Sequence, residues 1–206
     1  MVYKNLFNRL FFSIFFLILY LIVLNNIYLL FLLGTFIYLF IFYEVIKYFK
    51  IFFRLIIFYL FFSYFCFTFY ILNFFDFITF NVFIFTIILF DSFSFFTGKI
   101  FGKKYMFKYL SPKKTLEGYL GGILLTNLSL ISAFYLISIQ IQFFSLILLI
   151  NLTVFFSIFG DLIESYFKRA NNMKDSSSFL PGHGGYFDRF DSFVASIIIL
   201  NIFNLL

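Results

Sequence analysis

Apolar residues form seven long stretches along this chain, and polar residues gather in the segments between them. A helix that crosses a bilayer needs about 20 apolar residues. Backbone groups in lipid must also be hydrogen-bonded internally, which favours helices over open strands. We therefore predict an all-α polytopic integral membrane protein with about seven transmembrane helices. They are Leu6–Leu24, Ile27–Tyr43, Ile51–Leu72, Phe77–Phe96, Tyr119–Ile139, Phe143–Ile163 and Phe193–Leu206, and the last, the shortest, can begin within the segment before it.

The positive charges follow this division. All 15 Lys and Arg residues lie in the N-terminal tail, in the second, fourth and sixth connecting segments, or in the first turn of the helix that follows one of these. Segments that face the cytoplasm are enriched in Lys and Arg. The pattern predicts a cytoplasmic N-terminus and a C-terminus on the opposite side. It also places two long segments, Lys99–Gly118 and Ser165–Ser192, on the cytoplasmic side as the active-site loops.

Composition supports a membrane protein and narrows the chemistry. The chain is 64% hydrophobic and 12% charged, against about 25% charged residues in soluble domains. We expect one membrane-embedded domain over residues 1–206, with a helical part at 1–90 and a catalytic part at 91–206. Cys66 is the single cysteine, which excludes an intramolecular disulfide and a thiolate metal cluster. The net charge of +6 suits either membrane topology or an anionic substrate.

Carboxylates gather around the most polar stretch, Ser165–Asp191. Asp161 and Glu164 are spaced to share one helical face, as are Asp188 and Asp191. Two such pairs suit a hard divalent cation such as Mg²⁺, which takes a few carboxylates together with phosphate oxygens. The alternative is that these acids are solvated and balance the neighbouring cations.

Cations flank these acids in both long segments. A metal with several cations beside glycine-containing loops is the arrangement that phosphoryl or nucleotidyl transfer needs, because that chemistry depends on positioning and charge neutralisation. The alternative partner for these cations is an anionic lipid headgroup. The candidate residues are Lys113 and Lys114, which follow Ser111, and Lys168, Arg169, Lys174 and Arg189.

The tetrapeptide Gly182–Gly185 surrounds the only histidine of the chain. Residues without a Cβ let backbone N–H groups approach a phosphate closely. His183 is open to three interpretations: phosphate contact, proton transfer, or a structural role in the turn. Asp91 is a further candidate, because an ionisable residue within an apolar run is costly and often functional.

Three segments carry a family resemblance. They read SYFKRANNMKDSSSFLPGHGGYFDRFD at 165–191, GKIFGKKYMFKYLSPKKTLEGYLGG at 98–122 and GDLIES at 160–165. Together they closely resemble the phosphatidate cytidylyltransferase (CDP-diacylglycerol synthase) family. The resemblance covers roughly the C-terminal half of the chain, and the first 90 residues match only as hydrophobic helices. Around Asp91 the family usually has D-x-G-A-Y, whereas this chain has Asp-Ser-Phe-Ser-Phe.

The resemblance implies an enzyme that joins CTP and phosphatidic acid into CDP-diacylglycerol and pyrophosphate. It also implies dependence on Mg²⁺, as one ion or two, and a homodimer in the cell membrane with the active site facing the cytoplasm. We expect CTP and bilayer phosphatidic acid as the substrates and no nucleic acid as a partner.

The resemblance further implies roles for particular residues. The metal ligands fall on Asp161 and Asp188, with Asp191 close by. The triphosphate and the lipid phosphate would be neutralised by Lys168, Arg169, Lys174 and Arg189. The substrate pocket would also include Ser111, Lys113, Lys114, Glu117, Ser165, His183, Gly184 and Gly185.

Three other functions compete with this one. Another CTP-using lipid enzyme, such as a polyprenol kinase or an archaeal-lipid cytidylyltransferase, would share the membrane, CTP and Mg²⁺ but not the full 165–191 pattern. A transporter or channel predicts polar residues spread through several helix centres, whereas here they gather at one face. An inert structural protein would not need two charged, glycine-bearing loops on the same side.

Overall fold

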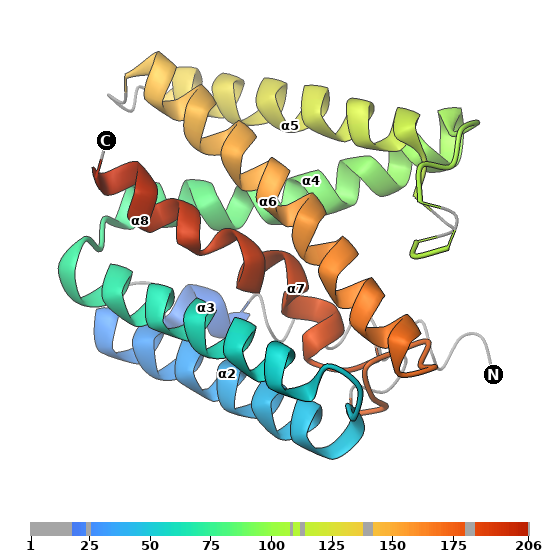
Figure 1. Ribbon diagram of the computed structural model, residues 1–206. Helices are drawn as coiled ribbons and strands as arrows, with labels where there is room; N and C mark the ends of the chain where they lie inside the picture. Colours follow the sequence, from blue (N-terminus) through green and yellow to red (C-terminus); the bar gives the residue numbers. More distant parts are fainter. Residues whose placement is uncertain are drawn as a thin grey trace. The chain divides into compact units, whose positions relative to one another are not determined.

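The computed structural model describes residues 18–23, 26–107, 109–111, 114–137, 142–179 and 184–205, and Figure 1 shows it as a ribbon. Within these ranges there is no named strand, and Tyr105 and Thr115 form an isolated antiparallel bridge. The all-α prediction is therefore confirmed for the described part of the chain. Its named helices are α2 (Ile27–Tyr48), α3 (Phe53–Asn73), α4 (Phe77–Phe101), α5 (Leu116–Ile137), α6 (Phe143–Ala170), α7 (Phe187–Ser196) and α8 (Ile198–Leu205).

Five of these helices, α2 to α6, are long and apolar enough to cross a membrane. The protein is thus a multi-pass membrane protein. The first predicted helix, Leu6–Leu24, lies mostly outside the described residues, although 18–23 are helical. The last predicted helix is divided at Ile197 into α7 and α8, and it begins at Phe187, within the preceding segment.

Helices α4 and α6 extend beyond the apolar runs that predicted them. The connecting segments are consequently shorter than expected, at 102–115 and 171–186. Cations occupy the last turn of both helices: Lys99 in α4, and Lys168 and Arg169 in α6. Positive charge at a helix C-terminus interacts favourably with the helix dipole, so these residues continue the helix instead of ending it.

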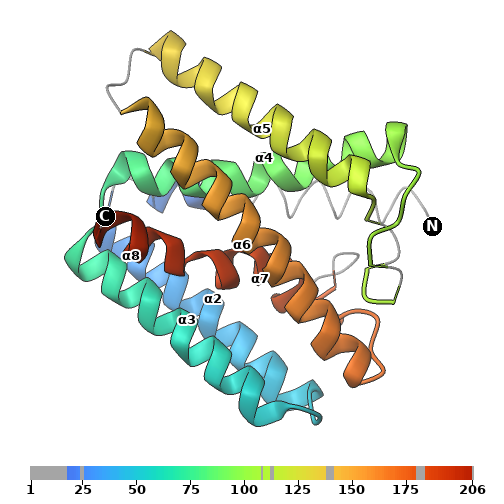
Figure 2. The same cartoon turned by 45° about the horizontal axis from the view of Figure 1, so that its top comes forward.

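The chain divides into two units, and the first combines the residues up to Asn73 with Tyr166–Asp191. Its α2 and α3 lie side by side and run in opposite directions (Figures 1 and 2). Their interface holds a buried hydrogen bond of 2.5 Å between the Tyr38 and Ser63 hydroxyls. Gly34 also allows close packing, because a Cβ there would overlap the Phe67 ring.

The second unit combines Phe74–Ser165 with Ser192–Leu206. Small residues let α4 and α5 approach closely, as in other membrane helix pairs: a Cβ on Gly121 would lie 2.7 Å from the Thr97 side chain. Phe90, Tyr119 and Val154 form a buried cluster that joins α4, α5 and α6. This packing positions the segment between α4 and α5.

Candidate active site

Asp188, in the first turn of α7, is the centre of the polar cluster in the first unit. Its Oδ1 accepts a hydrogen bond of 2.7 Å from Lys168 Nζ. Its Oδ2 accepts from the backbone N–H groups of Ser176 at 2.8 Å and Gly185 at 2.9 Å. One carboxylate therefore connects the end of α6, the middle of the 171–186 segment and the start of α7. Its negative charge is held by one cation and two backbone dipoles.

Gly184 is needed for this arrangement. Its φ of +84° lies in the left-handed region, where a side chain is strained. A Cβ there would also lie 2.5 Å from Asp188 Oδ2. Glycine is therefore required here for two reasons: the backbone conformation and the space that the Asp188 carboxylate occupies.

Asn171 fixes the other end of the segment. Its Oδ1 accepts from the N–H groups of Lys50 and Ile51, both at 2.8 Å, and its Nδ2 donates to the Ile51 carbonyl at 3.1 Å. The side chain of Arg169 donates to the Met173 carbonyl at 2.8 Å. The Asn171 bonds connect the residue after α6 to the turn between α2 and α3, both in the first unit, and the Arg169 bond holds the start of the 171–186 segment.

Sequence reasoning missed Glu44, a fully buried carboxylate on α2. It accepts hydrogen bonds from the N–H groups of Tyr186 at 2.8 Å and Phe187 at 3.4 Å. The sequence does contain a sign that Glu44 is functional, since this acid directly follows the apolar run Ile27–Tyr43. The rule that made Asp91 a candidate applies equally to Glu44.

The second unit has its own lysine–aspartate pair, formed by Lys114 and Asp161. Nearby, Glu117 accepts from the N–H groups of Lys103 at 3.0 Å and Lys104 at 3.1 Å. Thr115 caps α5 by accepting from the Gly118 N–H at 3.2 Å. In this structure the Glu117 carboxylate therefore holds the backbone of the 102–115 segment, and its contact with substrate stays a prediction.

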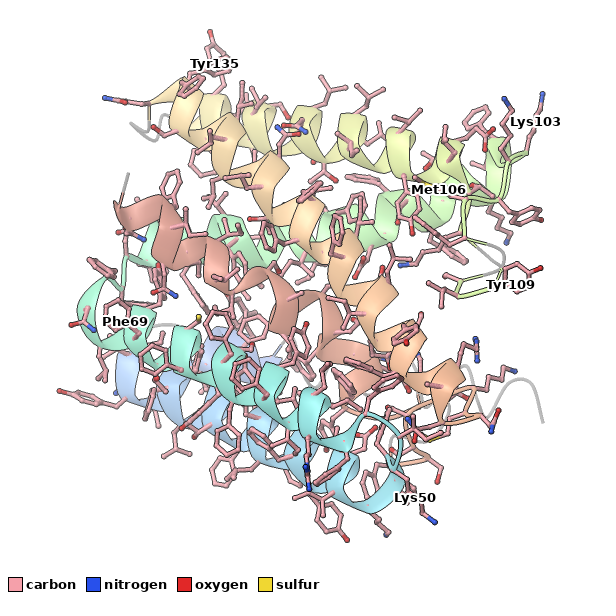
Figure 3. All side chains as sticks on the ribbon, viewed as in Figure 1. Lys50, Phe69, Lys103, Met106, Tyr109 and Tyr135 are labelled. Carbon is pink, nitrogen blue, oxygen red and sulfur yellow. The ribbon has the colours of Figure 1, made fainter. Side chains whose placement is uncertain are left out.

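Tyr105, Met106 and Tyr109 are exposed side chains of the 102–115 segment. Tyr109 is 94% exposed, and Figure 3 shows its side chain and that of Lys103 extending away from the helices. Ser111 lies in a turn in which its N–H donates to the Phe107 carbonyl at 2.9 Å. A loop of this kind can present its lysines to an anionic ligand.

The remaining predicted residues differ in how the structure places them. Lys113 and His183 lie outside the described residues, so their roles stay predictions. Asp191 is buried, whereas Lys174 and Arg189 are exposed and Ser165 is partly buried. The structure thus brings Lys168, Asp188, Gly184 and Gly185 together in one unit, and Lys114 and Asp161 in the other.

The carboxylates meet only part of the requirement for a metal. Among the described residues, no three His, Cys, Asp or Glu side chains group to hold an ion. Mg²⁺ is usually bound by one or two carboxylates together with substrate phosphates and water, not by an all-protein cage. Asp161 and Asp188 are hard oxygen donors, and each lies against a lysine. The chemistry of each of these two donors therefore fits an Mg²⁺ ion that arrives with a phosphate ligand.

Comparison with known proteins identifies the class. The model of the cytidylyltransferase family matches residues 2–206, so the chain belongs to that family. Among curated relatives, phosphatidate cytidylyltransferase of Staphylococcus haemolyticus is 39% identical over 105 residues, and that of Staphylococcus aureus is 40% identical over 108. The enzyme of Staphylococcus epidermidis is 41% identical over 105 residues.

These alignments cover 51% of this chain and 40% of each relative. The chain therefore aligns with less than half the length of the curated relatives. The predicted resemblance to this family is confirmed.

Proposed function

We propose that the protein catalyses the reaction of CTP with phosphatidic acid to give CDP-diacylglycerol and pyrophosphate. The observation that carries the proposal is the Asp188 cluster, in which a lysine and two backbone N–H groups of the family-like segment converge on one carboxylate. Membership of the cytidylyltransferase family supports the reaction type. The apolar helices support a substrate that resides in lipid.

In the proposed reaction a phosphate oxygen of phosphatidic acid attacks the α-phosphorus of CTP. A new P–O bond forms there, and the bond to the bridging oxygen breaks and releases the β- and γ-phosphates as pyrophosphate. The second pKa of a phosphate monoester is about 6, so the nucleophile is already ionised at neutral pH. The reaction then needs no general base, which favours phosphate contact over proton transfer for His183.

The chain's contribution is to position charged groups and neutralise them. Lys168 and Arg169 at the end of α6, with Lys174 and Arg189, would bind phosphate oxygens of the two substrates. Lys114, with Lys113, Ser111 and Glu117, would also bind substrate phosphate oxygens. Mg²⁺, when bound as one ion or two, would supply further neutralisation of the triphosphate, and the ligands we propose for it are Asp161, Asp188 and Asp191.

The two lysine–aspartate pairs bear on how the free protein prepares to bind phosphate and metal. Lys168 and Lys114 each contact an aspartate predicted as a metal ligand. With phosphate and metal present, each lysine would be available to bind a phosphate oxygen, and each carboxylate would be available to hold the metal. The pairs thus keep both charges compensated in the free protein, where an unpaired charge would be costly.

The proposal includes the membrane topology. Seven spans with a cytoplasmic N-terminus would place all 15 cations on the side where CTP is available. We propose the bacterial cell membrane as the location, in line with the staphylococcal relatives. We also propose that the protein forms a homodimer and that it has no nucleic-acid partner.

The test uses purified protein in detergent with α-labelled CTP, phosphatidic acid and Mg²⁺. Labelled CDP-diacylglycerol is the expected product, and its absence while a control enzyme works in the same detergent would contradict the proposal. Asp188→Asn should remove turnover, because the variant loses one carboxylate oxygen and its charge. Asp175→Asn is the matched control, since Asp175 is an exposed acid of the same segment, and its activity should stay near that of the wild type.

A further inference from the structure

Glu44 is a buried acid with an unusual set of partners. It lies near the end of α2 and is 0% exposed. Its carboxylate accepts from two successive backbone N–H groups, those of Tyr186 and Phe187. A Cβ on Gly185 would overlap both the Glu44 carboxylate and the Ser176 hydroxyl. The backbone at Gly185 therefore lies directly against this side chain.

The bonds to Glu44 compensate for a missing helix cap. The first N–H groups of a helix have no intrahelical acceptor, and a Ser, Thr, Asp or Asn before the helix usually supplies one. Here the residue before α7 is Tyr186, whose side chain stacks on Phe40 with ring centroids 4.8 Å apart. Glu44 supplies the acceptor from another helix, and its oxygen suits the partial positive charge at the start of the α7 dipole.

Aromatic contacts bring α2 to the same segment at a second point. Tyr43 stacks on Phe179 with ring centroids 5.7 Å apart, and Lys47 lies 5.4 Å from the centroid of the Phe179 ring. Glu44 therefore acts within an ordered contact between α2 and the 171–186 segment.

We propose that Glu44 is a positioning residue for Asp188. Three successive N–H groups are divided between the two carboxylates: Gly185 donates to Asp188, while Tyr186 and Phe187 donate to Glu44. The backbone of 185–187 cannot rotate without breaking bonds to both acids. Glu44 thus fixes the start of α7 and the direction in which Asp188 points. The inference rests on the proposed function only in taking Asp188 as a ligand of a phosphate-bound metal.

A merely structural role for Glu44 would give a different result. If Glu44 only stabilised the packing of α2, its removal would lower the stability of the protein without changing the metal affinity of the folded molecules. If it positions Asp188, its removal weakens metal binding in protein that is still folded. Residues that orient a metal ligand typically contribute 10–100-fold to metal affinity.

The experiment measures Mn²⁺ binding in the presence of CTP by electron paramagnetic resonance, which does not depend on turnover. Hydrogen exchange of the peptide spanning 184–190 follows the two N–H bonds directly. Both N–H groups donate to Glu44 Oε2, which Glu44→Ala removes, whereas Glu44→Gln keeps one side-chain oxygen that can accept them. Ser63→Ala is the matched control, because it removes a buried bond of α2 with α3 that does not involve the segment. Cys66, which is buried, reports unfolding through its reaction with a thiol dye.

We expect Glu44→Ala to weaken Mn²⁺ binding about 10-fold or more and to speed exchange at Tyr186 and Phe187. Glu44→Gln should stay close to the wild type in both, and Ser63→Ala should keep its metal affinity. Unchanged Mn²⁺ affinity in folded Glu44→Ala, or unchanged exchange at 186–187, would overturn the proposal.

If Glu44→Ala does not fold, a second variant tests whether Glu44 positions Asp188. Gly185→Ala keeps the Glu44 charge but pushes its carboxylate away, because the new Cβ occupies the same space. This variant should also weaken Mn²⁺ binding, and wild-type affinity in it would overturn the proposal. Failure of the wild type to make CDP-diacylglycerol would instead contradict the proposed function. The role of Glu44 would still be decided by the Mn²⁺ affinities and the hydrogen exchange, because neither depends on turnover.

Discussion

The two units of this protein contain the same two polar contacts, but these contacts differ in how deeply they are buried. Each has a lysine–aspartate pair, Lys168–Asp188 in the first and Lys114–Asp161 in the second. Each also has a glutamate that accepts from two successive backbone N–H groups of a loop. In the first unit the glutamate is Glu44, which is fully buried and lies 142 positions before Tyr186 in the sequence. In the second it is Glu117, which lies only 14 positions from Lys103 and is less buried.

The difference shows that similar hydrogen bonds can contribute unequally to the stability of the fold. Water can replace an acceptor lost from an exposed site, whereas a buried N–H that loses its acceptor bears the full cost of desolvation. We therefore expect the first unit to depend more strongly on its polar contacts. The more open loop of the second unit is the better suited to meeting a ligand and adjusting to it.

The largest effect is expected from removing the lysines. Lys168→Met leaves Asp188 partly buried without its cation, and the Lys168 and Asp188 side chains are only 13% and 11% exposed. The free energy of unfolding should fall by up to about 3 kcal/mol. For Lys114→Met, whose lysine is 32% exposed, the loss should be about 1 kcal/mol or less.

Thermal unfolding followed by the reaction of Cys66 with a thiol dye measures both losses. Turnover of CTP should fall about 100-fold in either variant, because each removes a group that neutralises phosphate charge. Equal stability losses in the two variants would contradict the contrast between the units.

A smaller difference is expected between the glutamates. Glu44→Ala leaves two buried N–H groups without their acceptor and should lower the free energy of unfolding by about 1–3 kcal/mol. Glu117→Ala exposes its two N–H groups to water and should lower it by less than about 1 kcal/mol. Denaturant titrations of the two variants, with Asp175→Asn as a surface control, compare them directly. A larger loss for Glu117→Ala would reverse the ranking.

The cap of α5 should give a small effect, similar in size to those of the other second-unit variants. Thr115→Ala removes the acceptor for the Gly118 N–H, and the loss of such a cap costs about 1 kcal/mol. Thr115→Ser keeps the hydroxyl and should retain most of that stability. If both variants lost the same stability, the Thr115 methyl group and not its hydroxyl would matter at this position.

The sequence was sufficient to predict five of the membrane helices and the family, because both are encoded in runs of apolar residues and in fixed spacings of polar ones. It could also group Lys168 and Asp188, which belong to one motif. It could not show that Glu44 belongs with Asp188. The partners of Glu44 are backbone N–H groups, which every residue except proline carries, so no residue type reveals them.

The helix ends were harder to predict for a related reason. Lys99, Lys168 and Arg169 are polar, and polarity alone indicated loops. Their favourable position at helix C-termini only becomes visible once the direction of each helix is known. Similarly, Glu117 was recognisable as a functional acid in a loop, but not as the acceptor for Lys103 and Lys104.

The most direct test of the account follows the fate of individual phosphorus atoms of CTP. Purified protein receives phosphatidic acid, Mg²⁺ and CTP labelled either at the α- or at the γ-phosphate. Cytidylyl transfer predicts that the α-label enters the lipid product and that the γ-label appears in pyrophosphate. A γ-label in the lipid would show phosphoryl transfer by a kinase, and a lipid fraction that contained neither label would contradict the proposed activity altogether.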